Sequence, residues 1–127
     1  MIILLIIIGS KVIYKDDYAV IEGNVILASG EGGTYKDNTF TINYPSGFNA
    51  NNCVVVALGT TVNYFNENGL HYGFNYGDVS FGNESVALLV GNQPKQVRLL
   101  KNNIELEIFN VSGNEQREYY RIVLMKI

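Results

Sequence analysis

The residues best suited to chemistry lie between positions 62 and 82, VNYFNENGLHYGFNYGDVSFG, where aromatic rings alternate with amides and carboxylates. The face of an aromatic ring covers the apolar C–H patch of a sugar ring. Amide and carboxylate groups exchange hydrogen bonds with the sugar hydroxyls. The candidate ligand contacts are Tyr64, Asn66, His71, Tyr72, Asn75, Tyr76 and Asp78.

The same aromatic spacing also has a plainer interpretation. In an extended chain Tyr72, Phe74 and Tyr76 share one face, and His71 and Asn75 share the other. Aromatic stripes in β proteins usually fill a core or a subunit contact. The segment therefore predicts either a sugar-binding surface or an ordinary packing surface.

Residues for catalysis are scarce. Glu105 and Glu107 stand two positions apart on one strand face, a spacing that could mimic a glycosidase carboxylate pair but is more typical of a solvated strand face. His71 is the only histidine and Cys53 the only cysteine, and no known Cys–His signature fits them. We expect Cys53 to be a small buried hydrophobe. The sequence predicts a protein that is not an enzyme, with no catalytic residue, metal site or cofactor.

Length and composition limit the number of domains, the size of the core and the class of partner. The chain has 127 residues and 14.1 kDa, which predicts a single domain spanning residues 1–127. Hydrophobic residues make up 47% and charged residues 17%, enough for a core without disulfides. The net charge is −3 and basic residues do not cluster, so we expect no nucleic-acid partner.

The N-terminus, MIILLIIIGSK, carries an apolar run from Ile2 to Ile8. This run is shorter than the ~20 residues of a membrane-spanning helix. It also lacks the basic flank of a signal peptide. We expect no membrane insertion, and we interpret residues 1–10 as a strand that is buried on both faces or packed against another subunit.

Strand patterns with a period of two dominate the rest of the chain. NTFTINY at 38–44, IELEIFN at 104–110 and EYYRIVLMKI at 118–127 alternate strongly, and the last is apolar on both faces. Glycine, asparagine and proline punctuate the chain at short intervals. This pattern predicts an all-β fold, an antiparallel β-sandwich of jelly-roll type.

Two polar segments are predicted to be turns. In YPSGFNANN at 44–52, Pro45 ends a strand, Ser46 and Gly47 turn the chain, and Phe48 anchors the corner to the core. The strand that follows, CVVVALGTTV at 53–62, is predicted to pass through the middle of the domain. GEGG at 30–33 is predicted to be a hairpin turn.

Roughly residues 24–59, including VILASGEGGTYKDNTFTINYPSGFNANNCVVVALG, resemble the C-terminal tip domains of tail-fibre or receptor-binding proteins from phages and prophages of Gram-positive bacteria. The resemblance implies a non-enzymatic β-sandwich, commonly a homotrimer, that binds a saccharide or protein of the bacterial surface. It places the chain in the virion, or in the bacterial cytoplasm when expressed from a prophage. The chain departs from these proteins in having no fibrous shaft.

Two alternatives remain open. The chain could be a structural virion component, such as a baseplate or decoration protein, which oligomerises but binds no ligand. It could also be a monomeric carbohydrate-binding module of a secreted enzyme. Because strands that are apolar on both faces need more burial than one sandwich provides, the sequence favours a homo-oligomer, and the resemblance favours a trimer.

Overall fold

A computed structural model describes residues 7–62, 64–66, 69–71, 79–81, 85–90, 93–110 and 113–127. Between residues 61 and 94 the description covers the backbone alone. The strands are β1 Lys11–Lys15, β2 Tyr18–Leu27, β3 Lys36–Ile42, β4 Cys53–Val62, β5 Tyr64–Asn66, β6 Gly69–His71, β7 Val79–Phe81, β8 Ser85–Val90, β9 Gln93–Leu99, β10 Ile104–Asn110 and β11 Gln116–Lys126.

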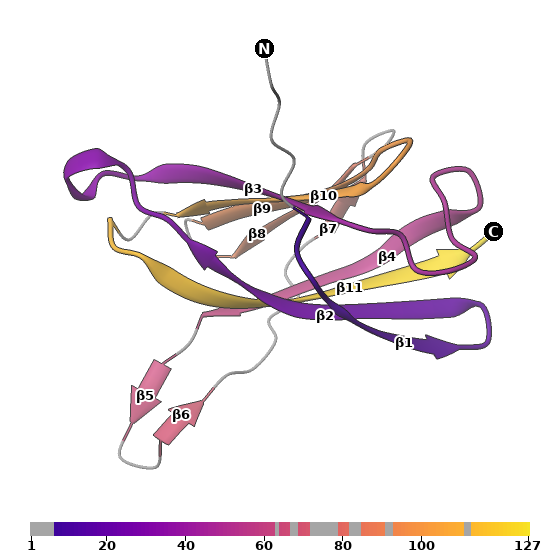
Figure 1. The fold of residues 1–127 in the computed structure, drawn as a ribbon, viewed down its shortest axis with the longest axis horizontal. Coiled ribbons are helices and arrows are strands. Elements are labelled where there is room, and N and C mark those ends of the chain that lie inside the picture. Colours follow the sequence, from indigo (N-terminus) through magenta and orange to yellow (C-terminus); the bar gives the residue numbers. More distant parts are fainter. Residues whose placement is uncertain are drawn as a thin grey trace.

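The strands form two main antiparallel sheets that face each other (Figure 1). One has four strands in the order β1-β2-β11-β4, and the other has five in the order β3-β10-β9-β8-β7. The strands β5 and β6 form a separate two-stranded hairpin. The predicted all-β antiparallel sandwich is confirmed.

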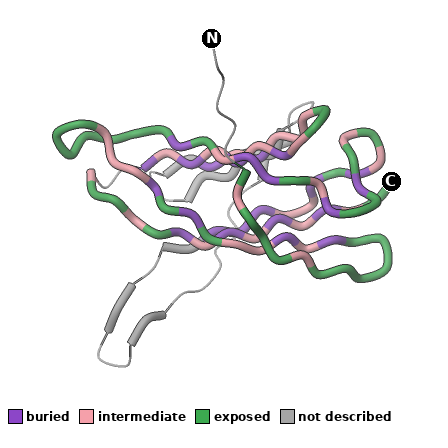
Figure 2. Tube along the Cα trace, in the orientation of Figure 1, coloured by how far each residue is buried: buried purple, intermediate pink, exposed green. Residues whose placement is uncertain are grey.

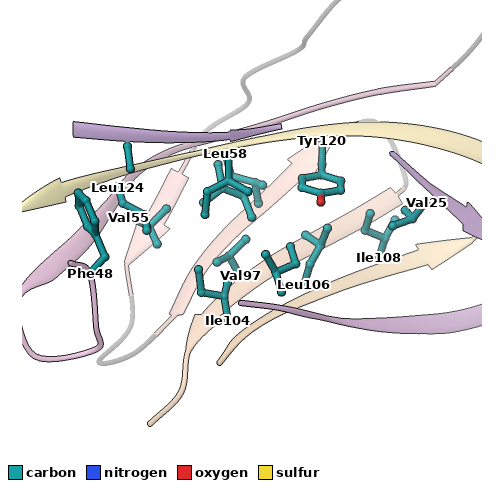
Figure 3. Packing of buried hydrophobic residues seen from close by; sticks show 14 of the residues in the cluster. Val25, Phe48, Val55, Leu58, Val97, Ile104, Leu106, Ile108, Tyr120 and Leu124 are labelled. Atoms are coloured by element: carbon teal, nitrogen blue, oxygen red, sulfur yellow. The ribbon is translucent and has the colours of Figure 1, made fainter. Parts of the chain in front are cut away.

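The core lies between the two sheets, and burial alternates along β2, β10 and β11 (Figure 2). In β10, Ile104, Leu106 and Ile108 are fully buried, as the two-residue period predicts. In β11, Tyr120, Ile122 and Leu124 are fully buried, and side chains from the two sheets meet in the middle (Figure 3). The last strand, β11, is an inner strand of its sheet and pairs with β2 on one side and β4 on the other.

The corner at residues 44–52 is structural, as predicted. Phe48 is buried and belongs to the core cluster. Its ring lies 6.4 Å from that of Tyr14, and the Lys126 ammonium lies 5.0 Å from its centroid. The Asn49 amide donates to Asn52 Oδ1 over 2.8 Å, which closes the turn. The Asn-rich sequence therefore supplies hydrogen bonds to a backbone that has no strand partner.

Two topological predictions are wrong. The strand β4 is the last strand in the order of its sheet and pairs with β11, so it does not pass through the middle of the domain. The GEGG segment contains a 3₁₀ turn, η1 Glu31–Gly33, and it links β2 in one sheet to β3 in the other. The Asn38 side chain supports this crossing, because Oδ1 accepts from the Ala28 amide at 3.0 Å and Nδ2 donates to its carbonyl at 3.1 Å.

The structure describes the N-terminal apolar run from residue 7 onward. Ile7 forms an isolated parallel bridge with Thr41, and the Ile8 amide donates to the Thr41 carbonyl over 3.0 Å. Ile8 packs against the core, whereas Ile7 is 49% exposed. Residues 1–6, where most of the predicted N-terminal strand falls, lie outside the described residues.

Candidate functional site

The hairpin of β5 and β6 carries three of the seven candidate ligand contacts. Its register pairs Tyr64 with His71 and Asn66 with Gly69. The hairpin belongs to neither main sheet and stands apart from both in Figure 1. The other four candidates, Tyr72, Asn75, Tyr76 and Asp78, lie outside the described residues.

The Glu105 and Glu107 carboxylates lie on the outer face of the five-stranded sheet, beside an arginine. Arg98 Nη1 lies 2.5 Å from Glu105 Oε1 and 3.8 Å from Glu107 Oε2. The pKa of Glu107 is raised by partial burial and by the nearby Asp37 carboxylate, while Arg98 opposes the shift. Thr39, Gln96 and these charged groups make this face polar, as expected for a solvated strand face.

The outer face of the four-stranded sheet has the opposite character. Alternation along β1, β2, β4 and β11 directs apolar side chains away from the core, and several remain partly exposed. We call this surface the apolar outer face. It consists of Ile13, Tyr18, Val20, Val54, Ala57, Val123 and Met125.

An ion pair buried between the sheets escaped the sequence analysis. Lys95 Nζ on β9 lies 2.8 Å from Glu118 Oε1 on β11, and the two side chains are 2% and 1% exposed. Burial raises the pKa of the Glu118 carboxyl, and attraction to Lys95 with a smaller contribution from Thr60 only partly offsets it. The two-residue period of the strands could have placed both charges in the core. Lys95 lies two residues before the buried Val97, and Glu118 lies two residues before the buried Tyr120.

The thiol of Cys53 is buried at the start of β4. Its Sγ donates to the Asn49 carbonyl oxygen over 3.1 Å, so the thiol helps to hold the corner. Burial raises the pKa of Cys53, and the hydrogen bond to the Asn49 backbone opposes that shift. A protonated, buried thiol is a poor nucleophile. The expectation of a small buried hydrophobe is confirmed.

The described part of the chain offers neither a metal site nor a membrane-spanning helix. No group of three or more His, Cys, Asp or Glu side chains comes together there in a way that would hold a metal ion. Its elements also include no helix with the length and apolarity that a membrane span requires.

Comparisons with known proteins found no similarity to report, because no protein family, curated protein or solved structure matches the chain.

Proposed function

We propose that this chain is a non-enzymatic, oligomeric binding module of a phage or prophage tail, which attaches to a saccharide or protein on the bacterial surface. The observation that carries the proposal is the β5–β6 hairpin, a two-stranded ribbon outside both sheets that pairs Tyr64 with His71. A tyrosine ring offers a stacking face to a sugar, and an imidazole offers a hydrogen-bonding group. The resemblance of residues 24–59 to tail tips supports the same conclusion.

The apolar outer face supports the oligomeric part of the proposal. Monomeric proteins rarely leave a contiguous apolar surface of several hundred Å² in water. Several copies in one assembly would also raise the apparent affinity for a repetitive cell surface by roughly 10²–10⁴-fold where the geometry allows. Weak contacts at each hairpin would then suffice for attachment.

The first test is binding of the labelled protein to intact Gram-positive cells and to an array of bacterial glycans. Tyr64→Ala should weaken binding by about 10-fold or more, because aromatic residues dominate such contacts. His71→Ala should weaken it as well. The matched control is Tyr35→Ala, which removes a tyrosine that is 61% exposed in the connection between β2 and β3. The control should bind as the wild type does.

Two outcomes would contradict the ligand-binding role. A Tyr64→Ala variant that loses several degrees of melting temperature would assign the ring to packing. Wild-type protein that oligomerises but binds neither cells nor glycans would favour a structural tail component, such as a baseplate or decoration protein. The apolar outer face also supports this second function, because a structural tail component needs a surface for self-association but no ligand site.

A further inference from the structure

The apolar outer face has an ordered pattern across its four strands. The register places its residues in two rows that run perpendicular to the strands, and a third, charged row borders them. The rows are Lys15, Tyr18, Met125 and Val54; then Ile13, Val20, Val123 and Ala57; then Lys11, Glu22, Arg121 and Gly59. Two rows are mainly apolar and the third is charged. Within the charged row, Arg121 Nε donates to Glu22 Oε1 over 2.8 Å.

We infer that a second copy of this chain covers the apolar outer face, related by a two-fold axis that runs parallel to the strands between β2 and β11. Such an axis places β2 of one copy over β11 of the other. Val20 then opposes Val123 of the second copy, and Tyr18 opposes Met125. At the sheet edges the bulky Ile13 opposes the small Ala57. Face-to-face sheets pack in this aligned manner, about 10 Å apart.

Charge complementarity selects this axis. With the axis parallel to the strands, Glu22 of each copy opposes Arg121 of the other, so the two ion pairs form an alternating square of charges. With an axis across the strands, Lys11 of one copy would oppose Lys15 of the other. That arrangement would also place Glu22 over an apolar ring, Tyr18. The axis parallel to the strands also places one charge, Lys15, over an apolar side chain, Val54, but it opposes no like charges, and like charges in contact are unfavourable.

The size of the face is that of the central part of an interface. Four strands about 4.8 Å apart, with the five residues of β2 that pair with β1 (Tyr18 to Glu22) at about 3.4 Å each, span roughly 330 Å² in projection. A standard protein interface buries about 800 Å² per partner, so the outer sides of β2, β4 and β11 beyond Glu22 must also take part. Ile13, Tyr18 and Val54, which are 40%, 42% and 37% exposed, would lose most of their remaining contact with water.

The pairing has a consequence for the proposed binding hairpin. The strand β4 begins opposite Lys126 and ends opposite Glu118, so the hairpin that follows it leaves the sheet at the end away from the β1–β2 turn. A two-fold axis parallel to the strands keeps both hairpins at the same end of the pair. The dimer interface itself does not depend on the hairpin function, but it would make attachment bivalent if that function holds.

The first experiment is the molar mass of the wild type in solution at micromolar concentration, by sedimentation equilibrium. We expect about twice 14.1 kDa. Val123→Glu places an unpaired charge at the centre of the face and should raise the dissociation constant by at least about 100-fold. Gln96→Glu adds the same charge on the polar outer face of the five-stranded sheet and should leave the dimer intact. A wild-type mass of one chain, or of three, would overturn the proposed pair.

A second experiment distinguishes the interface from a merely structural role of the Glu22–Arg121 pair. Glu22→Arg and Arg121→Glu should each weaken self-association, since each variant brings four like charges together across the axis. Mixing the two variants should restore a dimer, because every arginine then opposes a glutamate of the other chain. The ion pair inside each chain stays broken in that mixture, so a structural role predicts no recovery. Failure of the mixture to form a heterodimer would refute the two-fold arrangement.

Discussion

Removing one member of the buried ion pair should destabilise the protein by about 3–5 kcal/mol. Lys95→Met leaves the Glu118 carboxyl alone between the sheets, and Glu118→Leu leaves the Lys95 ammonium alone. Neither oxygen of Glu118 accepts a well-aligned hydrogen bond from the described residues, so little else compensates the charge. The measurement is the free energy of unfolding in urea at a fixed protein concentration, because self-association also contributes to stability.

The double variant Lys95→Met/Glu118→Leu makes this prediction specific. Because it fills the same space with apolar groups, it should recover most of the loss or exceed the stability of the wild type. The matched control is Arg98→Met, which breaks the half-exposed pair with Glu105. An exposed pair contributes about 1 kcal/mol or less. Equal losses for Lys95→Met and Arg98→Met would show that burial does not set the strength of the pair.

The pH dependence of stability follows from the raised pKa of Glu118. A carboxyl whose pKa in the folded state lies above its ordinary 4.5 holds its proton more tightly when folded. The stability that it contributes is complete below pH 4.5 and declines as the pH rises through the raised value. The difference in unfolding free energy between the wild type and Glu118→Gln should therefore shrink across that window. A difference that grew with pH would mean that attraction to Lys95 outweighs the cost of burial.

The same pair shows how far the sequence could be interpreted. A two-residue period predicts which side chains face the core, and β10 and β11 follow it residue by residue. That period places Lys95 beside Val97 and Glu118 beside Tyr120 on inward faces, so two opposite charges inside the sandwich were predictable in principle. Their contact was not, since it depends on which strands of the two sheets face each other.

Topology was the part that local patterns did not determine. The apolar residues on both faces of β4 predicted a central strand, yet its outward residues Val54 and Ala57 belong to the apolar outer face. The GEGG turn was predicted to close a hairpin because glycine-rich turns commonly do. Instead, β2 pairs with β11 and β3 pairs with β10, both over long sequence separations, so the two strands beside the turn lie in different sheets. The Asn38 hydrogen bonds to Ala28 support the crossing between the sheets.

The candidate site was predictable only as a composition. Aromatic and amide residues in the segment from 62 to 82 suggested a ligand, and the Asn- and Gly-containing NENG at 66–69 is typical of a turn. The pairing of Tyr64 with His71 follows from the short hairpin register, which a two-residue period does not fix. For Tyr72, Asn75, Tyr76 and Asp78 the sequence prediction stands without a structural test.

Adding a single methyl group at Gly23 should destabilise the fold by about 1–3 kcal/mol. Gly23 on β2 pairs directly with Tyr120 on β11. A Cβ atom there would come within 2.6 Å of the ring carbon Cζ and closer still to the hydroxyl. Elsewhere in a strand, replacing glycine with alanine favours folding by roughly 0.5–1 kcal/mol, so the expected sign is reversed. Tyr120 is fully buried, so its ring has no easy route to solvent. The same burial raises the pKa of its hydroxyl to about 12.

A double-mutant cycle assigns the cost of Gly23→Ala to the tyrosine. Tyr120→Leu opens a cavity and is destabilising by itself. In that background Gly23→Ala should cost less than about 0.5 kcal/mol, because the atoms that a Cβ would meet are gone. Gly9→Ala is the control, since a Cβ there meets nothing within 4 Å. If Gly23→Ala cost the same with and without the ring, the glycine would be needed for its backbone rather than for the space that Tyr120 occupies.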